Sequence, residues 1–357
     1  MYDFVFILPL PSRVPVGGYK VIYEYSNRLV QRGYKVAIFF YPGKLKSILR
    51  LLKALASIIK HKMQLTVRPS WFDLDKRVDT KFLFDSRLVS NTYKAKNYVA
   101  TAWQTADIAL QLSRKFDAQG IYLVQDYEEW SGSPIDIDAT FSIGLKNIAI
   151  SRWLQDLILD KGNNCHYIPN GLDFDDFYVN DDIELRNGES ILGMYHKLAK
   201  KGSKDIIDAY KEIHKKYKNA KFTLFSVYEK PEEIPEWVNY IHLPDKAELL
   251  KIYNEAAIFV TASYYEGWGL PACEAMQCGC ALVASKVAGH MEFAEDGKNS
   301  LVFEPGDVRA LVKKIEYLLE EPSLRISLAR YGSESIKSFS WQKSVDKFIA
   351  ITSGGKI

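Results

Sequence analysis

Two series of short apolar runs, each alternating with longer amphipathic stretches, constrain the fold of this chain most strongly. The first series comprises residues 3–10, 35–41, 81–85, 98–104, 120–126 and 147–151, and the second comprises residues 190–196, 222–228, 240–244, 257–263, 280–285 and 300–305. Buried strands separated by amphipathic helices are typical of βαβ units, which build parallel sheets. The sequence therefore predicts two successive open α/β sheets.

A polar segment separates the two series. Turn-forming and acidic residues cluster over residues 166–190, and we interpret this segment as a linker. A chain of 357 residues is long enough for two domains of ordinary size. Because ligands of open α/β sheets bind beyond the carboxyl ends of the strands, we expect the functional site in a cleft between the two domains.

Composition argues against several other classes of protein. A formal net charge of +3 is too small to indicate nucleic-acid binding. Four cysteines are too few for a disulfide scaffold in a chain of this length, which fits a reducing cytosol. Residues 1–18 lack a basic region and are interrupted by prolines, so we interpret them as a first strand and not as a signal peptide. No apolar run approaches the ~20 residues that span a bilayer, and we expect a soluble or peripheral protein.

The segment YYEGWGLPACEAMQCGC, residues 264–280, holds two glutamates around a glycine-rich loop. Pro271 suits the first position of a helix, which would leave Glu266 in the loop and place Glu274 in the first helical turn. The amide groups of residues 267–272 would then form an anion site at a helix N-terminus, with carboxylates beside it that accept from hydroxyl groups. Such a site suits a sugar nucleotide. The alternative is that Glu266 caps the helix and Glu274 interacts with its dipole.

Two further loops have the composition of phosphate-binding sites. Residues 194–202 follow the first apolar run of the second series and contain His196, Lys197, Lys200, Lys201 and Gly202. Gly17 and Gly18 follow the first apolar run of the chain and precede an amphipathic stretch, so their amides form a second candidate anion site. The segment has no GxGxxG pattern, so a dinucleotide site is only weakly indicated. The alternative for residues 194–202 is a solvated basic loop.

These segments together resemble the retaining glycosyltransferases of family 4, which have the two-domain GT-B fold. EGWGLPACEAMQCGCALVASKVAGHMEF, which begins at Glu266, resembles the EX7E region of that family. VGGYKVIYEYSNRLVQRGYKV resembles the N-terminal glycine loop and helix, and YHKLAKKGSKDIIDAY resembles the donor-phosphate loop. AISRWLQDLIL and YIPNGLDFDDF resemble the segments around the domain crossover, and FSWQKSVDKF resembles the closing C-terminal helix. The resemblance covers nearly the whole chain.

The resemblance implies roles for individual residues. Glu266 matches the first glutamate, which contacts the donor sugar, and Glu274 matches the second, which holds the ribose hydroxyls. Lys201 matches the lysine that pairs with the diphosphate and favours its departure. The other matching donor-binding positions are Gly17, Gly18, His196, Lys197, Gly267, Gly269 and Leu270. Many family members have an arginine near the position of His196 and Lys197, so either residue is a candidate for the second phosphate cation.

The resemblance also implies the domains and the activity. We expect an N-terminal, acceptor-binding Rossmann-like domain over residues 1–172, and a C-terminal, nucleotide-sugar-binding Rossmann-like domain over residues 173–337. Residues 338–357 would form a helix that packs back on the N-terminal domain. The implied activity is retaining, metal-independent transfer of a hexose from a nucleoside-diphosphate sugar to a glycan or lipid-linked glycan, in bacterial surface-polysaccharide synthesis. Glu266 would position the donor, because no protein nucleophile is required.

Two other classes of protein stay open as alternatives. One is a GT-B-like sugar-nucleotide epimerase or phosphorylase, and the other is an inactive sugar-binding scaffold. The VQDYE run is similar to that of rhamnosyltransferases in bacterial surface-glycan assembly, which suggests a deoxythymidine-diphosphate rhamnose donor. In that run, Gln125 and Asp126 are candidates for contact with acceptor hydroxyls, with Glu128 beside them and Tyr127 or Trp130 as a stacking surface. The alternative is a structural loop.

Three short patterns could suggest a metal site, but we do not interpret any of them as one. Asp-Leu-Asp at residues 73–75 and Asp-Ile-Asp at residues 136–138 resemble the metal-binding pattern of the other glycosyltransferase fold, but both lie in polar, turn-like stretches. Cys273, Cys278 and Cys280 lack a histidine pair at zinc spacing, so we interpret them as small buried residues. We expect no metal and no cofactor besides the donor substrate.

Residues 44–62, KLKSILRLLKALASIIKHK, form a basic amphipathic stretch. Apolar residues fall on one helical face, and Lys46, Arg50, Lys53 and Lys60 fall on another. Such a helix can lie at the surface of an anionic membrane, with Trp71 and Phe72 as an interfacial anchor. This predicts a cytoplasmic protein that associates peripherally with the inner face of the cell membrane. The alternative is an ordinary helix packed on the N-terminal sheet.

Overall fold

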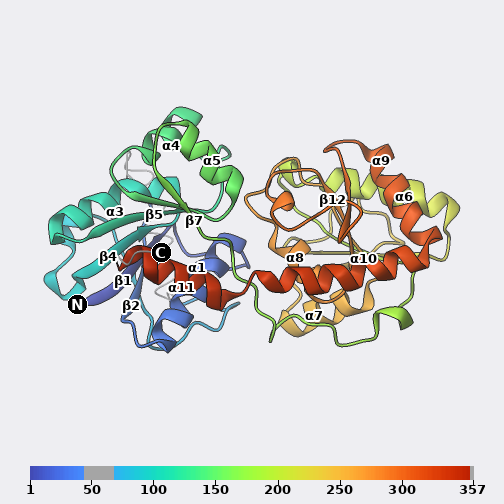
Figure 1. The fold of residues 1–357 in the computed structure, drawn as a ribbon, viewed down its shortest axis with the longest axis horizontal. Coiled ribbons are helices and arrows are strands. Elements are labelled where there is room, and N and C mark those ends of the chain that lie inside the picture. Colours follow the sequence, from blue (N-terminus) through green and yellow to red (C-terminus); the bar gives the residue numbers. More distant parts are fainter. Residues whose placement is uncertain (44–67, 354–357) are drawn as a thin grey trace. The chain divides into compact units, whose positions relative to one another are not determined.

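The computed structural model describes residues 1–43 and 68–353 and divides the chain into two compact units (Figure 1). The first unit comprises Met1–Pro169 and Gln342–Ile357, and the second comprises Asn170–Trp341. The boundaries that we expected at residues 172 and 337 thus lie at residues 169 and 341. The basic stretch of residues 44–62 lies outside the described residues, so the membrane-surface hypothesis stays a prediction from the sequence.

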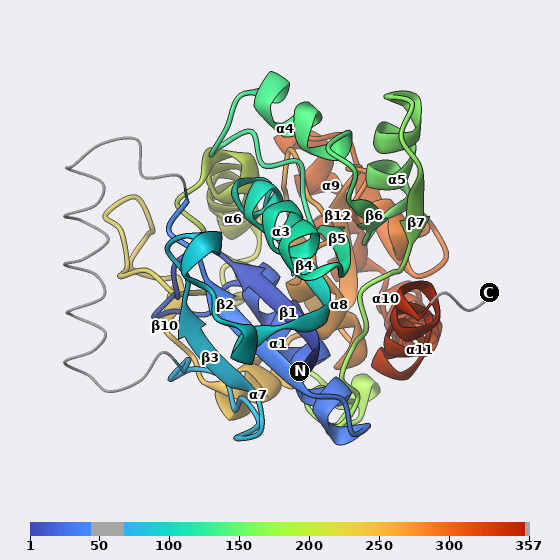
Figure 2. The same ribbon diagram turned by 90° about the vertical axis from the view of Figure 1, so that its left-hand side faces the viewer.

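A parallel sheet forms the centre of the first unit. Its strands in the described part of the chain are β1 (Tyr2–Leu8), β2 (Val36–Phe40), β3 (Asp79–Phe82), β4 (Ala95–Ala100), β5 (Gln119–Val124), β6 (Lys146–Ala149) and β7 (Cys165–Tyr167). They lie in the order β3-β2-β1-β4-β5-β6-β7, with parallel pairing throughout, as Figure 2 shows. Strands such as β2 are buried along their whole length because helices pack on the sheet, which explains why they appear as continuous apolar runs.

The helices of the first unit follow the strands in alternation. They are α1 (Gly17–Gln31), α3 (Trp103–Phe116), α4 (Pro134–Phe141) and α5 (Arg152–Asp160), with 3₁₀ turns at η1 (Ser86–Leu88) and η2 (Asn91–Tyr93). The final helix α11 (Trp341–Thr352) also packs on this unit. Its buried Phe348 contacts Phe4, Phe6 and Tyr25, with ring centroids 5.5, 6.0 and 5.0 Å away.

The structure differs from the sequence interpretation in three places. β7 overlaps the start of the stretch expected to be a linker, because three residues are too few to show a periodicity. The run expected as a strand over residues 98–104 ends at Ala100, because the hydroxyl of Thr105 accepts from the amides of Thr101 and Ala102 and α3 starts at Trp103. The stretch 136–138 is not turn-like, since it lies in α4 behind a Ser133 cap.

The second unit contains a second parallel sheet. Its strands are β8 (Ser190–Met194), β9 (Lys221–Ser226), β10 (Asn239–His242), β11 (Ile258–Thr261), β12 (Ala281–Ser285) and β13 (Ser300–Phe303), in the order β10-β9-β8-β11-β12-β13. Its helices are α6 (Ser203–Lys216), α7 (Lys246–Glu255), α8 (Leu270–Gln277), α9 (Val308–Glu320) and α10 (Pro322–Ser335). Its 3₁₀ turns are η3 (Ile183–Leu185), η4 (Ala199–Lys201), η5 (His290–Glu292) and η6 (Ile336–Ser338).

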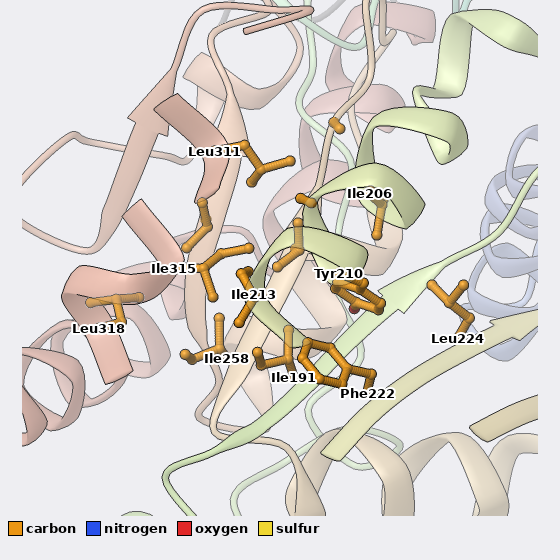
Figure 3. Close-up of a cluster of buried hydrophobic side chains, with 14 of the residues drawn as sticks. Ile191, Ile206, Tyr210, Ile213, Phe222, Leu224, Ile258, Leu311, Ile315 and Leu318 are labelled. Atoms are coloured by element: carbon orange, nitrogen blue, oxygen red, sulfur yellow. The ribbon is translucent and has the colours of Figure 1, made fainter. Parts of the chain in front are cut away.

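The apolar core of the second unit fixes α6 against the sheet (Figure 3). Ile206, Tyr210 and Ile213 recur at helical spacing along α6 and pack with side chains of β8, β9 and β11. Leu311, Ile315 and Leu318 of α9 repeat the same spacing. Full burial of one such side chain contributes about 1.5–3 kcal/mol, so this cluster holds the start of α6 firmly at the sheet edge.

The strand order reverses at one point in each sheet. In the second sheet β8 lies between β9 and β11, and in the first sheet β1 lies between β2 and β4. Connections leave such a pair of strands toward opposite faces, so the loops at their carboxyl ends diverge and leave room for a ligand. In the second unit these loops are residues 195–202 after β8 and residues 262–269 after β11.

Gly202 brings these two loops of the second unit into contact. Its φ is 65°, and a Cβ atom there would lie 1.9 Å from the carbonyl oxygen of Ala262. The amide of Tyr264 donates to the carbonyl oxygen of Lys200 at 2.8 Å, which joins the loops further. Only glycine combines a left-handed backbone with the absence of a side chain at this contact.

The aromatic pair that we expected to anchor the chain to a membrane packs on the first unit. Trp71 and Phe72 contact Tyr23 of α1, with ring centroids 5.5 and 5.3 Å away. The indole N–H of Trp71 donates to the carbonyl oxygen of Ser12 at 3.0 Å. Among the described helices, none combines the length and the apolar character needed to cross a bilayer.

We predict that Gly202→Ala lowers the free energy of unfolding of the second unit more than Gly297→Ala does. Both glycines have positive φ, 65° and 74°, so both substitutions introduce left-handed strain of about 1–2 kcal/mol. Only at residue 202 does the new methyl group meet a backbone atom, since no atom lies within 4 Å of a Cβ at residue 297. Urea denaturation followed by circular dichroism measures both losses, and equal losses would contradict the close contact.

Candidate functional site

Lys201 and Glu266 form an ion pair at the point where the strand order of the second sheet reverses. The Nζ atom of Lys201 lies 2.6 Å from Oε1 of Glu266, and the two side chains are 19% and 10% exposed. Lys201 ends η4 after β8, and Glu266 lies in the loop after β11. The hydroxyl group of Ser263 donates to the same carboxylate oxygen at 2.9 Å. The structure thus brings together two residues that are far apart in the sequence.

The Glu266 carboxyl group is ionised despite its burial. Burial by itself raises the pKa of Glu266, but the charge of Lys201 and the hydrogen bonds from Lys201 and Ser263 outweigh it. The pKa of Glu266 is therefore lower than that of an ordinary glutamate. A fixed negative charge at this position can stabilise a developing positive charge on a bound molecule.

The helix after Glu266 begins one residue earlier than predicted. α8 starts at Leu270, Gly269 is its N-cap with φ of 110°, and Pro271 occupies the second position. Glu274 therefore lies just beyond the first turn, where its carboxylate accepts from the buried hydroxyl of Tyr253 at 3.1 Å. The alternative that Glu266 caps this helix is wrong, because no side chain of the described residues caps α8.

The helix starts of the second unit differ in how they are capped. α7 and α9 begin with Asp245 and Asp307, whose carboxylates accept from backbone amides at 2.9 Å. α6 and α8 begin with Gly202 and Gly269, and within the described chain no side chain caps either helix. α10 also lacks a side-chain cap from the described residues, but its N-cap is Glu321, whereas the two helices with a glycine N-cap lie on either side of the Lys201–Glu266 pair. Their amide groups are therefore suited to bind an anionic ligand.

Trp268 fixes the glycine loop that carries Gly267 and Gly269. Its ring is 3% exposed and contacts Phe293 and Phe339, with centroids 6.1 and 5.3 Å away. Gly267 is buried and Gly269 and Leu270 are half-buried. The loop is thus anchored through its aromatic residue, while its backbone follows the edge of the site.

His196 is held as a hydrogen-bond acceptor in this structure. The amide of Leu198 donates to its Nδ1 atom at 3.0 Å, which requires a lone pair there. Burial, followed by the nearby charge of Lys201, lowers the pKa of His196 to about 4. The Nζ atom of Lys197 lies over the ring of Tyr228, 4.8 Å from its centroid.

The predicted residues of the first unit lie at the carboxyl ends of β1 and β5. Gly17 and Gly18 are the first residues of α1, and no side chain in the described ranges caps that helix. A Cβ atom at Gly18 would lie 3.6 Å from the amide group of Gln125, so these two residues are neighbours. Gln125 donates to the carbonyl oxygen of Thr101 at 3.3 Å, and the carboxylate of Asp126 accepts from the amide of Tyr127.

Two of the other acceptor-site candidates have structural roles in the first unit. The carboxylate of Glu128 accepts from the amide of Trp103 at 2.8 Å, at the start of α3. The hydroxyl of Tyr127 donates to Asp138 at 2.9 Å, and its ring is buried. Trp130 is 48% exposed on the same loop and is the aromatic surface that a ligand can reach.

Two residues beside Glu266 were missed in the sequence analysis. Ser263 donates to the Glu266 carboxylate, and His290 is buried in the turn after β12 that packs against the backbone of Glu266. A Cβ atom at Gly289, the residue before His290, would lie 2.4 Å from the carbonyl oxygen of Glu266. The glycine of the Ala-Gly-His segment after β12 indicates that another part of the backbone lies close to it, but the sequence does not show which loop this is.

The match to a known protein family lies within the second unit. Residues 179–335 match the family model of glycosyl transferases group 1. An uncharacterised glycosyltransferase of Methanocaldococcus jannaschii is 32% identical over 216 residues, which are 56% of this chain and 57% of that protein. The O-antigen chain mannosyltransferase B of Escherichia coli is 37% identical over 114 residues, which are 32% of this chain and 29% of that protein. This chain therefore spans less than two thirds of the length of each of these relatives.

A solved structure matches the whole chain. The crystal structure of Anabaena HepE in complex with UDP-glucose has a TM-score of 0.76 and 14% identity, over 99% of this chain and 100% of that chain. At this identity the likeness concerns the fold alone. Together with the two parallel sheets it confirms the predicted GT-B fold, and within that fold the second unit matches the glycosyl transferases group 1 family.

Proposed function

We propose that this chain is a retaining glycosyltransferase that transfers a sugar from a nucleoside-diphosphate donor to a glycan or lipid-linked glycan. The observation that carries the proposal is the Lys201–Glu266 pair between two helix starts whose N-caps are glycines. The group 1 match over residues 179–335 covers both of these residues. The GT-B likeness to a protein bound to UDP-glucose supports the donor class.

Lys201 and the amides of α6 and α8 would stabilise the leaving diphosphate. The bond between the anomeric carbon and the phosphate oxygen breaks, and negative charge develops on the diphosphate. Preorganised cations and amides at such a position commonly supply the largest part of catalysis. An ammonium group has three N–H donors, so Lys201 can contact Glu266 and a phosphate oxygen together.

Glu266 would hold the donor sugar and stabilise the positive charge that develops at the anomeric carbon. In the proposed retaining transfer, the departing phosphate oxygen takes the proton of the acceptor hydroxyl. The acceptor oxygen then bonds to the anomeric carbon on the face that the diphosphate has left. No protein nucleophile takes part, and no metal is required, because Lys201 and the amides supply the positive charge. Glu274 would bind the ribose hydroxyls.

The acceptor assignment is supported by the relatives and by the first unit. One relative is an O-antigen chain mannosyltransferase, which favours a surface polysaccharide or its lipid-linked precursor as acceptor. Gln125 and Asp126 lie beside the start of α1 at the carboxyl end of β5 and would contact acceptor hydroxyls. We further propose that residues 44–62 bring the enzyme to an anionic membrane surface, because that stretch is basic and amphipathic.

We predict that Glu266→Gln lowers kcat by about 100-fold or more, because the amide cannot stabilise the developing positive charge. The measurement is sugar transfer from a panel of UDP-, GDP- and dTDP-sugars, with and without a glycan acceptor. Glu295→Gln is a matched control, since it removes an exposed partner of Lys298. Circular dichroism of both variants establishes that they are folded.

Three outcomes of this assay would overturn the proposal. Unchanged kcat in Glu266→Gln would remove the central role of this residue. Turnover of the donor that proceeds equally without an acceptor would instead favour an epimerase or phosphorylase. A wild-type chain that neither binds nor turns over any donor of the panel would favour a scaffold protein.

We predict that the affinity of His196→Asn for the nucleoside-diphosphate donor stays within about twofold of the wild-type affinity between pH 6 and 8. The affinity of Lys201→Met for the same donor should fall about tenfold or more. The asparagine oxygen can keep the acceptor position of Nδ1. Because the pKa of His196 is lowered to about 4, its ring is neutral throughout this pH range and contributes no charge to lose. Isothermal titration calorimetry measures both affinities, and a pH-dependent loss in His196→Asn would identify His196 as a phosphate cation.

A further inference from the structure

His290 is a fully buried histidine that has no role in the chemistry proposed above. It lies in η5 and is 0% exposed. Its Nδ1 atom lies 2.9 Å from the carbonyl oxygen of Ser285 at the end of β12. A carbonyl oxygen can only accept, so Nδ1 carries the proton. Nε2 is buried and has no hydrogen-bond partner among the residues that the structure describes.

The edge of the His290 ring lies directly against Gly269, the residue that starts α8. A Cβ atom at Gly269 would lie 2.8 Å from Cδ2 and 3.1 Å from Nε2 of His290. Gly269 has φ of 110° and ψ of 55°. The imidazole therefore leaves room for a glycine only, and it supports the turn from which the first amides of α8 project.

The same short segment also supports the backbone of Glu266. A Cβ atom at Gly289 would lie 2.4 Å from the carbonyl oxygen of Glu266. The hydroxyl of Ser285 donates to the carbonyl oxygen of Ser263 at 2.6 Å, and the hydroxyl of Ser263 donates to the Glu266 carboxylate. The end of β12 and the residues after it thus contact the backbone of Glu266 and of Ser263 as well as the turn at Gly269.

The chemistry of the residue argues for a role beyond filling space. A buried acceptor without a partner destabilises a folded chain, so an apolar residue would suit a purely structural position better. The ring is also neutral, because burial lowers the pKa of His290 against the opposing effect of the Glu266 carboxylate. The imidazole ring places a flat edge against Gly269. The hydrogen bond from Nδ1 to the carbonyl oxygen of Ser285 fixes the orientation of this edge.

We propose that His290 is a positioning residue for sugar transfer, whose ring holds the Gly269 turn so that the amides at the start of α8 face the departing diphosphate. This inference rests on the proposed function and adds a residue to it. His290 touches neither the sugar nor the phosphate in this role. It acts through Gly269, so its loss should affect the steps in which the diphosphate is bound and released.

The variant His290→Asn separates the two features of the ring. Its side-chain N–H can still donate to Ser285, but it has no edge that reaches Gly269. We expect kcat and the affinity for the donor to fall about tenfold or more, while the KM of the acceptor stays unchanged. A general loss of structure would lower every parameter, so the unchanged acceptor KM distinguishes positioning from simple destabilisation. His166→Asn, at an exposed histidine of β7, is the matched control.

A double-mutant cycle tests the contact itself. Gly269→Ala places a methyl group against the ring of wild-type His290, whereas His290→Ala leaves space for it. We therefore expect Gly269→Ala to reduce kcat much less in the His290→Ala background than in the wild-type background. Kinetics are measured with the nucleoside-diphosphate sugar on which the wild-type chain turns over.

The outcomes separate this inference from the proposed function. No sugar transfer by the wild-type chain refutes the proposed function, and this inference falls with it. Transfer by the wild-type chain together with undiminished kcat and donor affinity in His290→Asn refutes the positioning role alone. Additive effects in the cycle would also refute it, because the ring would then not hold the turn.

Discussion

The ion pair between Lys201 and Glu266 is the interaction on which the candidate site depends. It joins the loop after β8 to the loop after β11, the two central strands between which the order of the sheet reverses. A buried charge pair of this kind is weak evidence for stability, because both ions lose their hydration. Its value lies in electrostatics, since it places a carboxylate with a lowered pKa beside an amino group, where a polar ligand would bind.

Backbone geometry prepares this site as much as charge does. Gly202 allows the two loops to touch, Gly269 accommodates the ring of His290, and Gly289 accommodates the backbone of Glu266. At each of these glycines, another group occupies the space that a side chain would fill. The result is a rigid support whose amide-bearing helix starts are held by the core of the second unit, and not by the loops alone.

Much of the fold could be predicted from the sequence, because parallel strands buried on both faces appear as apolar runs. Glu266, Glu274 and Lys201 could be selected as candidates because a recognisable local pattern surrounds each of them. Three other features could not be predicted. β7 is too short for a periodicity, His290 is set against Gly269 by the path of the chain, and burial in the folded unit lowers the pKa of His196.

The return of α11 to the first unit makes the second unit an uninterrupted insertion. Both ends of the chain belong to one unit, and the other is a continuous segment, Asn170–Trp341, attached at its two neighbouring ends. Leu172 and Ser340 form an isolated parallel bridge at this attachment. The coding sequence of a segment joined in this way can be deleted or exchanged as one piece, so the sequences of the two units are free to diverge at different rates.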